Sequence, residues 1–143
     1  MLVLDANILI RAVLGVRALA AITEYAGRVR FLAPTAAFDE ARAHLPKISL
    51  RRPIGSEDLV AVLDTLKAFI EVIEESAYTP RAGDARQRIA KRDPDDWHVL
   101  ALALTFGCAV WTEDTDFFGV GVATWTTDRI ELALGLLSAE PTA

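Results

Sequence analysis

The chain has 143 residues, 52% of them hydrophobic, which is enough for one buried core and excludes an intrinsically disordered protein. Its formal net charge of −5 argues against a protein that holds nucleic acid on a broad basic surface. A single cysteine excludes an internal disulfide and is typical of a reducing compartment. The longest apolar stretch is shorter than the roughly 20 residues of a membrane span, so we expect a cytoplasmic protein with no membrane partner.

Strand-like and helix-like patterns alternate along the first half of the chain. Residues 1–4 form a short apolar run, typical of a buried strand, and helical periodicity follows. Pro34 closes a second strand, and Thr35 and Ser56 are predicted to cap the next two helices, with a loop over residues 46–55 between them. In chain order we expect a strand at 1–4, helices at 7–14 and 18–25, a strand at 29–33, and helices beginning at residues 35 and 56.

The second half of the chain continues this alternation. In chain order we expect a strand at 69–73, a polar helix rich in arginine, an apolar helix opened by residues 93–96 and stopped by Gly107, strands at 108–112 and 120–125, and a helix at 127–137. Strands separated by helices predict a three-layer α/β/α sandwich with a mostly parallel central sheet of four to five strands. We expect residues 1–137 to form this single domain and residues 138–143 to be a frayed tail.

Acidic residues stand at four points where predicted elements end or turn. They are Asp5, Glu40, Asp96 and Asp114. Asp5 follows the first strand, Asp114 follows the fourth, and Asp96 begins the helix that leads into the fourth. Because ligands of parallel sheets bind beyond the carboxyl ends of strands, we expect these three acids to face one edge. A cluster of carboxylates needs cations, and its oxygen ligands favour Mg²⁺ or Mn²⁺, which indicates phosphodiester chemistry.

Each acid also has a purely structural interpretation. The run DPDD at 93–96 is typical of a helix start, with an acid as cap, a proline in the first turn and acids facing the helix dipole. Asp114 can likewise cap a short turn. Asp5 is harder to explain in this way, because a carboxylate directly after a buried strand costs free energy unless it has a partner. Glu40 lies in an Ala-rich helix, and helical geometry does not separate it from Asp39.

Four short segments follow one another along the chain. In order they are LDANIL, a mid-chain Glu followed by a Leu, DPDDWHVLALAL and VWTEDTDFF. In order and spacing they resemble the motifs of PIN-domain nucleases, and among these the VapC-like toxins of bacterial toxin–antitoxin pairs. The resemblance covers residues 1–128. It implies a PIN-like fold and a metal-dependent ribonuclease that uses one or two Mg²⁺ or Mn²⁺ ions to hydrolyse RNA. It also implies an antitoxin protein as partner and a homodimer.

The resemblance also implies roles for individual residues. The catalytic acids that it implies are Asp5, Glu40, Asp96 and Asp114. The metal ligands that it implies are Asp5, Asp96 and Asp114, with Asp116 as an additional outer ligand. Asn7 stands where many relatives carry Ser or Thr, and Asn7 and Thr112 are expected to orient the ligands. Asp96 is preferred to Asp95 because it correctly spaces the following apolar residues, whereas Glu40 is chosen by resemblance alone.

Cations are concentrated in the arginine-rich segment before the DPDD run. Four of them are Arg86, Arg88, Lys91 and Arg92. A solvated helix face and a surface that contacts RNA phosphates both explain such a run. On the second interpretation these four residues bind RNA, and any deficit of positive charge elsewhere is offset by cations bound at the acidic site.

Other protein classes fit the pattern less well. Haloacid-dehalogenase-type phosphatases require a second Asp two residues after the first, where this chain has Asn7. Response-regulator receivers require a Lys after a late strand, and no Lys follows Lys91. The alternative to a nuclease is therefore a PIN-fold module that binds RNA or protein without cleavage. The presence of all four acids argues against it.

Overall fold

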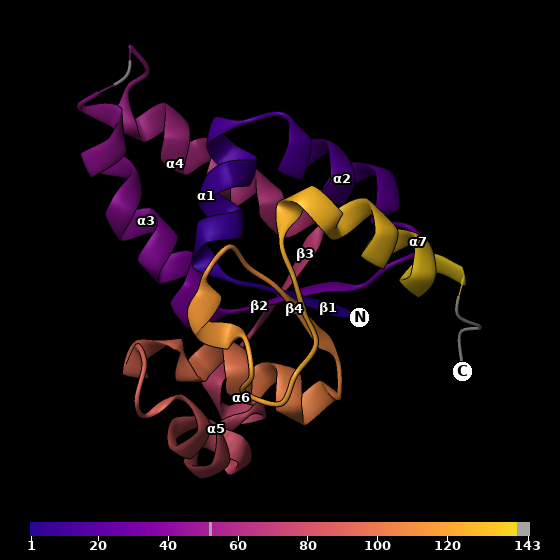
Figure 1. The fold of residues 1–143 in the computed structure, drawn as a ribbon. Helices are drawn as coiled ribbons and strands as arrows, with labels where there is room; N and C mark the ends of the chain where they lie inside the picture. Colours follow the sequence, from indigo (N-terminus) through magenta and orange to yellow (C-terminus); the bar gives the residue numbers. More distant parts are fainter. Residues whose placement is uncertain (52, 140–143) are drawn as a thin grey trace.

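Five short parallel strands form the central sheet of the protein (Figure 1). The computed structural model describes residues 1–51 and 53–139. In spatial order the strands are β3 (Ile70–Ile73), β2 (Phe31–Pro34), β1 (Leu2–Leu4), β4 (Ala109–Trp111) and β5 (Thr124–Trp125). Each neighbouring pair is parallel. The predicted α/β class with a parallel central sheet is confirmed.

Helices cover both faces of this sheet. Along β1 the side chains alternate, so that Leu2 and Leu4 pack into one core and Val3 packs into the other. The helices on the first face are α1 (Ala6–Leu14), α2 (Arg17–Tyr25), α3 (Thr35–Ser49), α4 (Ser56–Thr65) and α7 (Ile130–Ala139). The helices on the second face, at the bottom of Figure 1, are α5 (Ala82–Ile89) and α6 (Trp97–Phe106). Coverage on both sides explains why the three central strands, β1, β2 and β4, are continuously apolar.

Short 3₁₀ segments join several of these elements. They are η1 (Leu66–Ala68), η2 (Glu75–Ala77), η3 (Thr79–Arg81), η4 (Pro94–Asp96), η5 (Thr115–Phe117) and η6 (Thr127–Arg129). Two of them bear on the acidic residues, because η4 leads directly into α6 and η5 follows β4. The DPDD run therefore opens a 3₁₀ turn first and the apolar helix second.

The helix α3 continues through Pro46 to Ser49, so the first part of the predicted loop over residues 46–55 is wrong. A proline removes one helical hydrogen bond, but the preceding Leu45 is fully buried and α3 packs against α1 and α4. The Ser49 hydroxyl also donates to the Pro46 carbonyl at 2.8 Å. Tertiary packing thus carries the helix past a residue type that often ends helices.

The predicted caps of α3 and α4 are wrong by one position. Pro34 and Gly55 occupy the cap positions with extended backbone, and neither helix has a side-chain cap bond. Thr35 and Ser56 are instead the first residues of their helices. The Thr35 hydroxyl donates to the Ile73 carbonyl at 3.3 Å, which joins the start of α3 to the end of β3.

The strand β5 is shorter than the predicted run at 120–125. Gly119 and Gly121 have φ angles of +83° and +94°, so the chain turns here instead of extending. Between them, Val120 is buried in the core of the second face. The segment is therefore a loop that turns at two glycines and leads into a two-residue strand.

The strand order reverses between β1 and β4. The chain passes from β1 outward through β2 to β3 and then returns to the other side of β1 to form β4 and β5. The register pairs Leu4 with Trp111, and the Asp5 amide donates to the Trp111 carbonyl at 3.2 Å. Asp5 and the residues that follow β4 therefore leave the sheet side by side, at the switch point where parallel sheets bind their ligands.

The described helices reach into the predicted tail. α7 extends to Ala139, whereas residues 140–143 of the tail predicted at 138–143 lie outside the described residues. Within the part that the structure describes, no single helix is long and apolar enough to cross a membrane. Among the described helices, one pair, α1 and α2, meets such a test by combined length and composition, and these two helices are bent by 104° relative to each other.

Candidate active site

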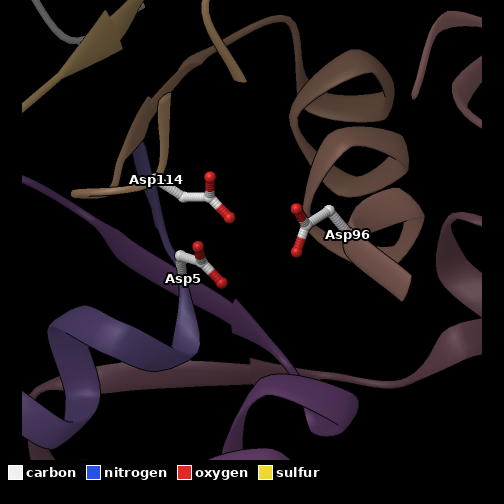
Figure 2. A group of neighbouring side chains, drawn as sticks. All are labelled: Asp5, Asp96 and Asp114. Atoms are coloured by element: carbon white, nitrogen blue, oxygen red, sulfur yellow. The ribbon is translucent and has the colours of Figure 1, made fainter. Parts of the chain in front are cut away.

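Three aspartates from distant parts of the chain converge at the switch point. Asp5 follows β1, Asp114 follows β4, and Asp96 stands at the start of α6. Each offers a carboxylate oxygen, and these oxygens all lie within 4.8 Å of one another. Figure 2 shows the three carboxyl groups pointing toward one another from separate elements. Because β1 and β4 are neighbours in the sheet, they bring two of the predicted acids together.

Asp5 is held rigidly and is only 4% exposed. Its Oδ1 accepts from the Ala6 amide at 2.7 Å, while its Oδ2 accepts from Asn7 Nδ2 at 2.9 Å and from the Thr112 hydroxyl at 2.8 Å. Burial raises the pKa of Asp5 against the opposing effect of these hydrogen bonds. Asn7 and Thr112, the two residues expected to orient the site, both contact this carboxylate.

Thr112 connects the acid after β1 with the acid after β4. Its Oγ1 accepts from the Asp114 amide at 2.9 Å and from Asn7 Nδ2 at 3.1 Å, while its hydroxyl donates to Asp5. The Asp114 carboxylate is fixed at its other side, because its Oδ1 accepts from the Asp116 amide at 2.9 Å. The turn-capping interpretation of Asp114 is therefore correct, but the cap leaves this carboxylate directed toward the other two.

Asp96 has a buried carboxylate oxygen without a partner. Among the described residues, no hydrogen bond reaches its Oδ2. It makes no cap bond to α6; the capping acid of this run is Asp93, which accepts from the Asp95 amide at 3.0 Å. Burial, followed by the charges of Asp5 and Asp114, raises the pKa of Asp96 to about 8.

These features fit a hard divalent cation. The three carboxylates supply oxygen ligands alone, which is the donor set that Mg²⁺ and Mn²⁺ prefer. Like charges held together, one of them with an unpartnered buried oxygen, are unfavourable in a metal-free protein and are stabilised when a cation neutralises them. The residues present are therefore suited to hold the ion that the sequence pattern implies.

Glu40 borders this group without joining it. It is exposed on α3, and it lines two cavities of about 250 and 270 Å³ that Asp5 and Asp96 also line. Partial burial and the Asp5 charge raise the pKa of Glu40. Asp39, which the sequence could not separate from Glu40, lines neither cavity. The geometry thus favours Glu40 over its neighbour as a member of the site.

Two histidines line the cavities beside the site. His98 lines the smaller cavity, and its Nδ1 is 2.8 Å from the Tyr78 hydroxyl. His44 lines the other cavity, with its Nε2 4.0 Å from a Glu40 oxygen. No motif surrounds either histidine. The only available signal was spacing, since His98 follows Asp96 by two residues and His44 follows Glu40 by one helical turn.

Asp116 lies beside the three aspartates but outside their group among the residues that the structure describes. Its amide donates to Asp114, and its carbonyl accepts from Arg92. Its contacts with the site are therefore made by its backbone. The ligand role expected of the Asp116 carboxylate stays a prediction.

The four cations expected to contact RNA have different environments. Arg88 donates to Asp84 at 2.7 Å and to the Val120 carbonyl at 3.1 Å, and Arg92 donates to backbone carbonyls after β4. The Arg86 guanidinium lies 4.2 Å from the centre of the Trp97 ring, and Lys91 is exposed. Three of the four side chains thus have partners within the protein, and their predicted RNA contacts stay predictions.

Comparison with known proteins agrees with this architecture. A chain in the crystal structure of VapBC2 from Rickettsia felis bound to a DNA fragment from their promoter is similar, with a TM-score of 0.70, 16% identity, and coverage of 87% of this chain and 97% of that chain. A chain in the structure of FitAB bound to an IR36 DNA fragment is also similar, with a TM-score of 0.60, 17% identity, and coverage of 89% and 95%. A search of curated protein sequences gave no match.

These likenesses extend over nearly the whole chain, and at such low identity they show the fold alone. Membership of a family follows from the sequence itself, because the model of the PIN domain matches residues 3–135. That range includes all three converging aspartates as well as Glu40. The chain belongs to the PIN domain family.

Proposed function

We propose that this protein is a metal-dependent endoribonuclease that hydrolyses RNA phosphodiester bonds at the site of Asp5, Asp96 and Asp114. The observation that carries the proposal is the convergence of three carboxylates at the switch point, one of them with a buried and unpartnered oxygen. Membership of the PIN domain family supports a nuclease. A binding module without activity would have no need of three mutually repelling acids at this position.

The three aspartates are the residues that would hold one or two Mg²⁺ or Mn²⁺ ions, which supply Lewis acidity and neutralise negative charge on the phosphate. Asn7 and Thr112 fix the orientation of Asp5 through its Oδ2, so this carboxylate does not have to reorganise when a ligand arrives.

Glu40 is the residue that we assign to proton transfer. It lines both cavities beside Asp5, and its raised pKa makes it a better proton acceptor for an attacking water than an ordinary exposed glutamate. The cavities of about 250 and 270 Å³ leave room beside the aspartates for a phosphodiester and its neighbouring sugar.

RNA cleavage with Mg²⁺ or Mn²⁺ is the direct test. Wild-type protein is expected to cleave, and Asp5→Asn and Glu40→Gln to lose most of the activity, while the matched control Asp39→Asn on the same helix retains it. EDTA is expected to abolish cleavage. Activity that survives both EDTA and Asp5→Asn would contradict the proposal.

A toxin role is a separate part of the proposal. Its support is the fold shared with chains of VapBC2 and FitAB, each solved as a complex with DNA. On this basis we propose an antitoxin protein as partner and a homodimer as the functional unit. Overproduction of active protein is expected to arrest growth, and a small protein is expected to copurify. Unaffected growth with no copurifying protein would end this part of the proposal and leave the nuclease activity to its own assay.

A further inference from the structure

The loop between β4 and β5 carries Asp114. Two arginines, Arg88 of α5 and Arg92 just after it, donate hydrogen bonds to backbone carbonyls of this loop. We propose that Arg88 and Arg92 are positioning residues that keep this loop, and with it the Asp114 carboxylate, directed at Asp5 and Asp96. The inference rests on the proposed function in one respect, namely that Asp114 acts in the site. It gives the two arginines a role different from the RNA contact that the sequence suggested.

Arg92 acts on the turn that follows Asp114. One guanidinium nitrogen, Nη1, donates to the carbonyls of both Asp116 and Phe118. The amide of the same Asp116 donates to Asp114 Oδ1 at 2.9 Å. Arg92 is therefore separated from the Asp114 carboxylate by one residue whose carbonyl and amide are both engaged.

Arg88 acts on the same loop four residues further along. Its Nη1 donates to the Val120 carbonyl at 3.1 Å. Its Nε donates to Asp84 Oδ1 at 2.7 Å, one helical turn earlier on α5. The ion pair with Asp84 fixes the guanidinium on the helix, so that α5 offers the loop an already oriented donor.

The backbone of the loop is shaped to receive these guanidinium groups. Gly119 and Gly121 have φ angles of +83° and +94°, which L side chains rarely adopt. A Cβ at Gly121 would lie 2.2 Å from Arg88 Nη1, and one at Gly119 would lie 3.6 Å from Arg92 Nη2. Both glycines thus turn the loop, and Gly121 also leaves the space in which the Arg88 guanidinium lies.

The contacts favour positioning over RNA binding. Three backbone carbonyls of one loop accept from the two side chains, so the N–H donors that make these bonds are already engaged within the protein. A phosphate contact would depend on charge, whereas holding the loop depends on the length and planar fork of arginine. Lysine keeps the charge and lacks the fork, so substitution by lysine separates the two roles.

The experiment compares Arg92→Lys and Arg92→Gln with Arg30→Lys. Arg30 is a matched control, because it is also a bonded arginine: it directly precedes β2 and pairs at 2.8 Å with Glu71 of β3, at the other side of the sheet from the loop. Hydrogen exchange of residues 115–121 measures the order of the loop. Mn²⁺ titration without RNA measures the metal affinity of the site that includes Asp114. Steady-state kinetics separate an effect on kcat from an effect on KM. Arg88→Lys repeats the test at the second donor if an Arg92 variant fails to fold.

We expect both Arg92 variants to exchange faster across residues 115–121, to bind Mn²⁺ about tenfold more weakly and to lose about tenfold in kcat with KM unchanged. Arg30→Lys should match the wild type in all three. Normal loop exchange in Arg92→Lys would overturn the inference, as would a KM that rises in Arg92→Gln and is rescued by lysine. If the wild type neither cleaves RNA nor binds Mn²⁺, the proposed function fails, while loop exchange still decides the role of Arg92.

Discussion

At the scale of single residues, the protonation of Asp96 determines how the metal-free protein responds to pH. Burial and the charges of Asp5 and Asp114 raise the pKa of Asp96 to about 8, while in the unfolded chain it is near the ordinary value of 3.8. Between these two values the folded state binds more protons than the unfolded state. The stability that Asp96 contributes is therefore full below the unfolded pKa and is lost as pH rises through the folded pKa. The pKa values of Asp5 and Glu40 are also raised, so their ionisation likewise lowers the free energy of unfolding as the pH rises.

We therefore predict that the free energy of unfolding in EDTA falls between about pH 5 and about pH 8. Asp96→Asn should flatten this dependence, because the amide does not titrate and does not repel its neighbours. Urea unfolding of both proteins across this range is the measurement. A wild-type stability that rises with pH, or a slope that Asp96→Asn leaves unchanged, would contradict the prediction.

The convergence of the site residues was only partly predictable from the sequence. The sequence pattern singled out Asp5, Asp96 and Asp114 because each stands at the end or the start of a predicted element. It could not show that the Asp5 carboxylate accepts from the hydroxyl of Thr112, 107 residues away in the chain. Nor could it show which acid of a capping run lacks a partner, because Asp93 and Asp96 have the same side chain and differ only in burial and contacts.

At the scale of elements, local patterns were sufficient where packing agrees with them and failed where packing overrides them. The strands β1 and β4 follow from apolar runs, and both ends were predicted within one or two residues. The extension of α3 past Pro46 depends on its contacts with α1 and α4, which no local signal shows. The opposite error occurred at β5, which was predicted too long because two glycines with positive φ interrupt an apolar run.

The loop before β5 allows a prediction at this scale. Gly121→Ala should lower the free energy of unfolding by about 1–3 kcal/mol, because alanine disfavours its φ of +94° and its Cβ would meet Arg88 at 2.2 Å. The matched control is Gly135→Ala in α7, where a Cβ would meet nothing within 4 Å. That change should stabilise the protein by about 0.5–1 kcal/mol, since alanine is the better helix former. Urea unfolding of the two variants should give opposite signs, and a neutral Gly121→Ala would show that the loop is not constrained in this way.

At the scale of the whole molecule, the site joins the central sheet to the helical layer on its second face. Asp5 and Asp114 extend from the central sheet, while Asp96 belongs to the helical layer of α5 and α6 on its second face. The sheet and this helical layer pack together in one cluster of buried side chains, and the three carboxylates meet at one edge of that contact. A cation held by all three would consequently link elements that are distant in the sequence, and its binding should stabilise the fold as a unit.

This linkage gives a prediction for global stability. A ligand that binds only the folded state at about 100 times its dissociation constant adds roughly 2.7 kcal/mol to the free energy of unfolding. Mn²⁺ at that excess should shift the urea midpoint of the wild type accordingly, with a larger shift at about pH 8 than at about pH 5, because protons compete for the same carboxylates. Asp5→Asn and Asp114→Asn should show little of this gain, while an equal ionic strength of NaCl controls for screening. Equal stabilisation of the wild type and both variants would mean that Mn²⁺ acts elsewhere on the surface and that the three aspartates do not form a metal site.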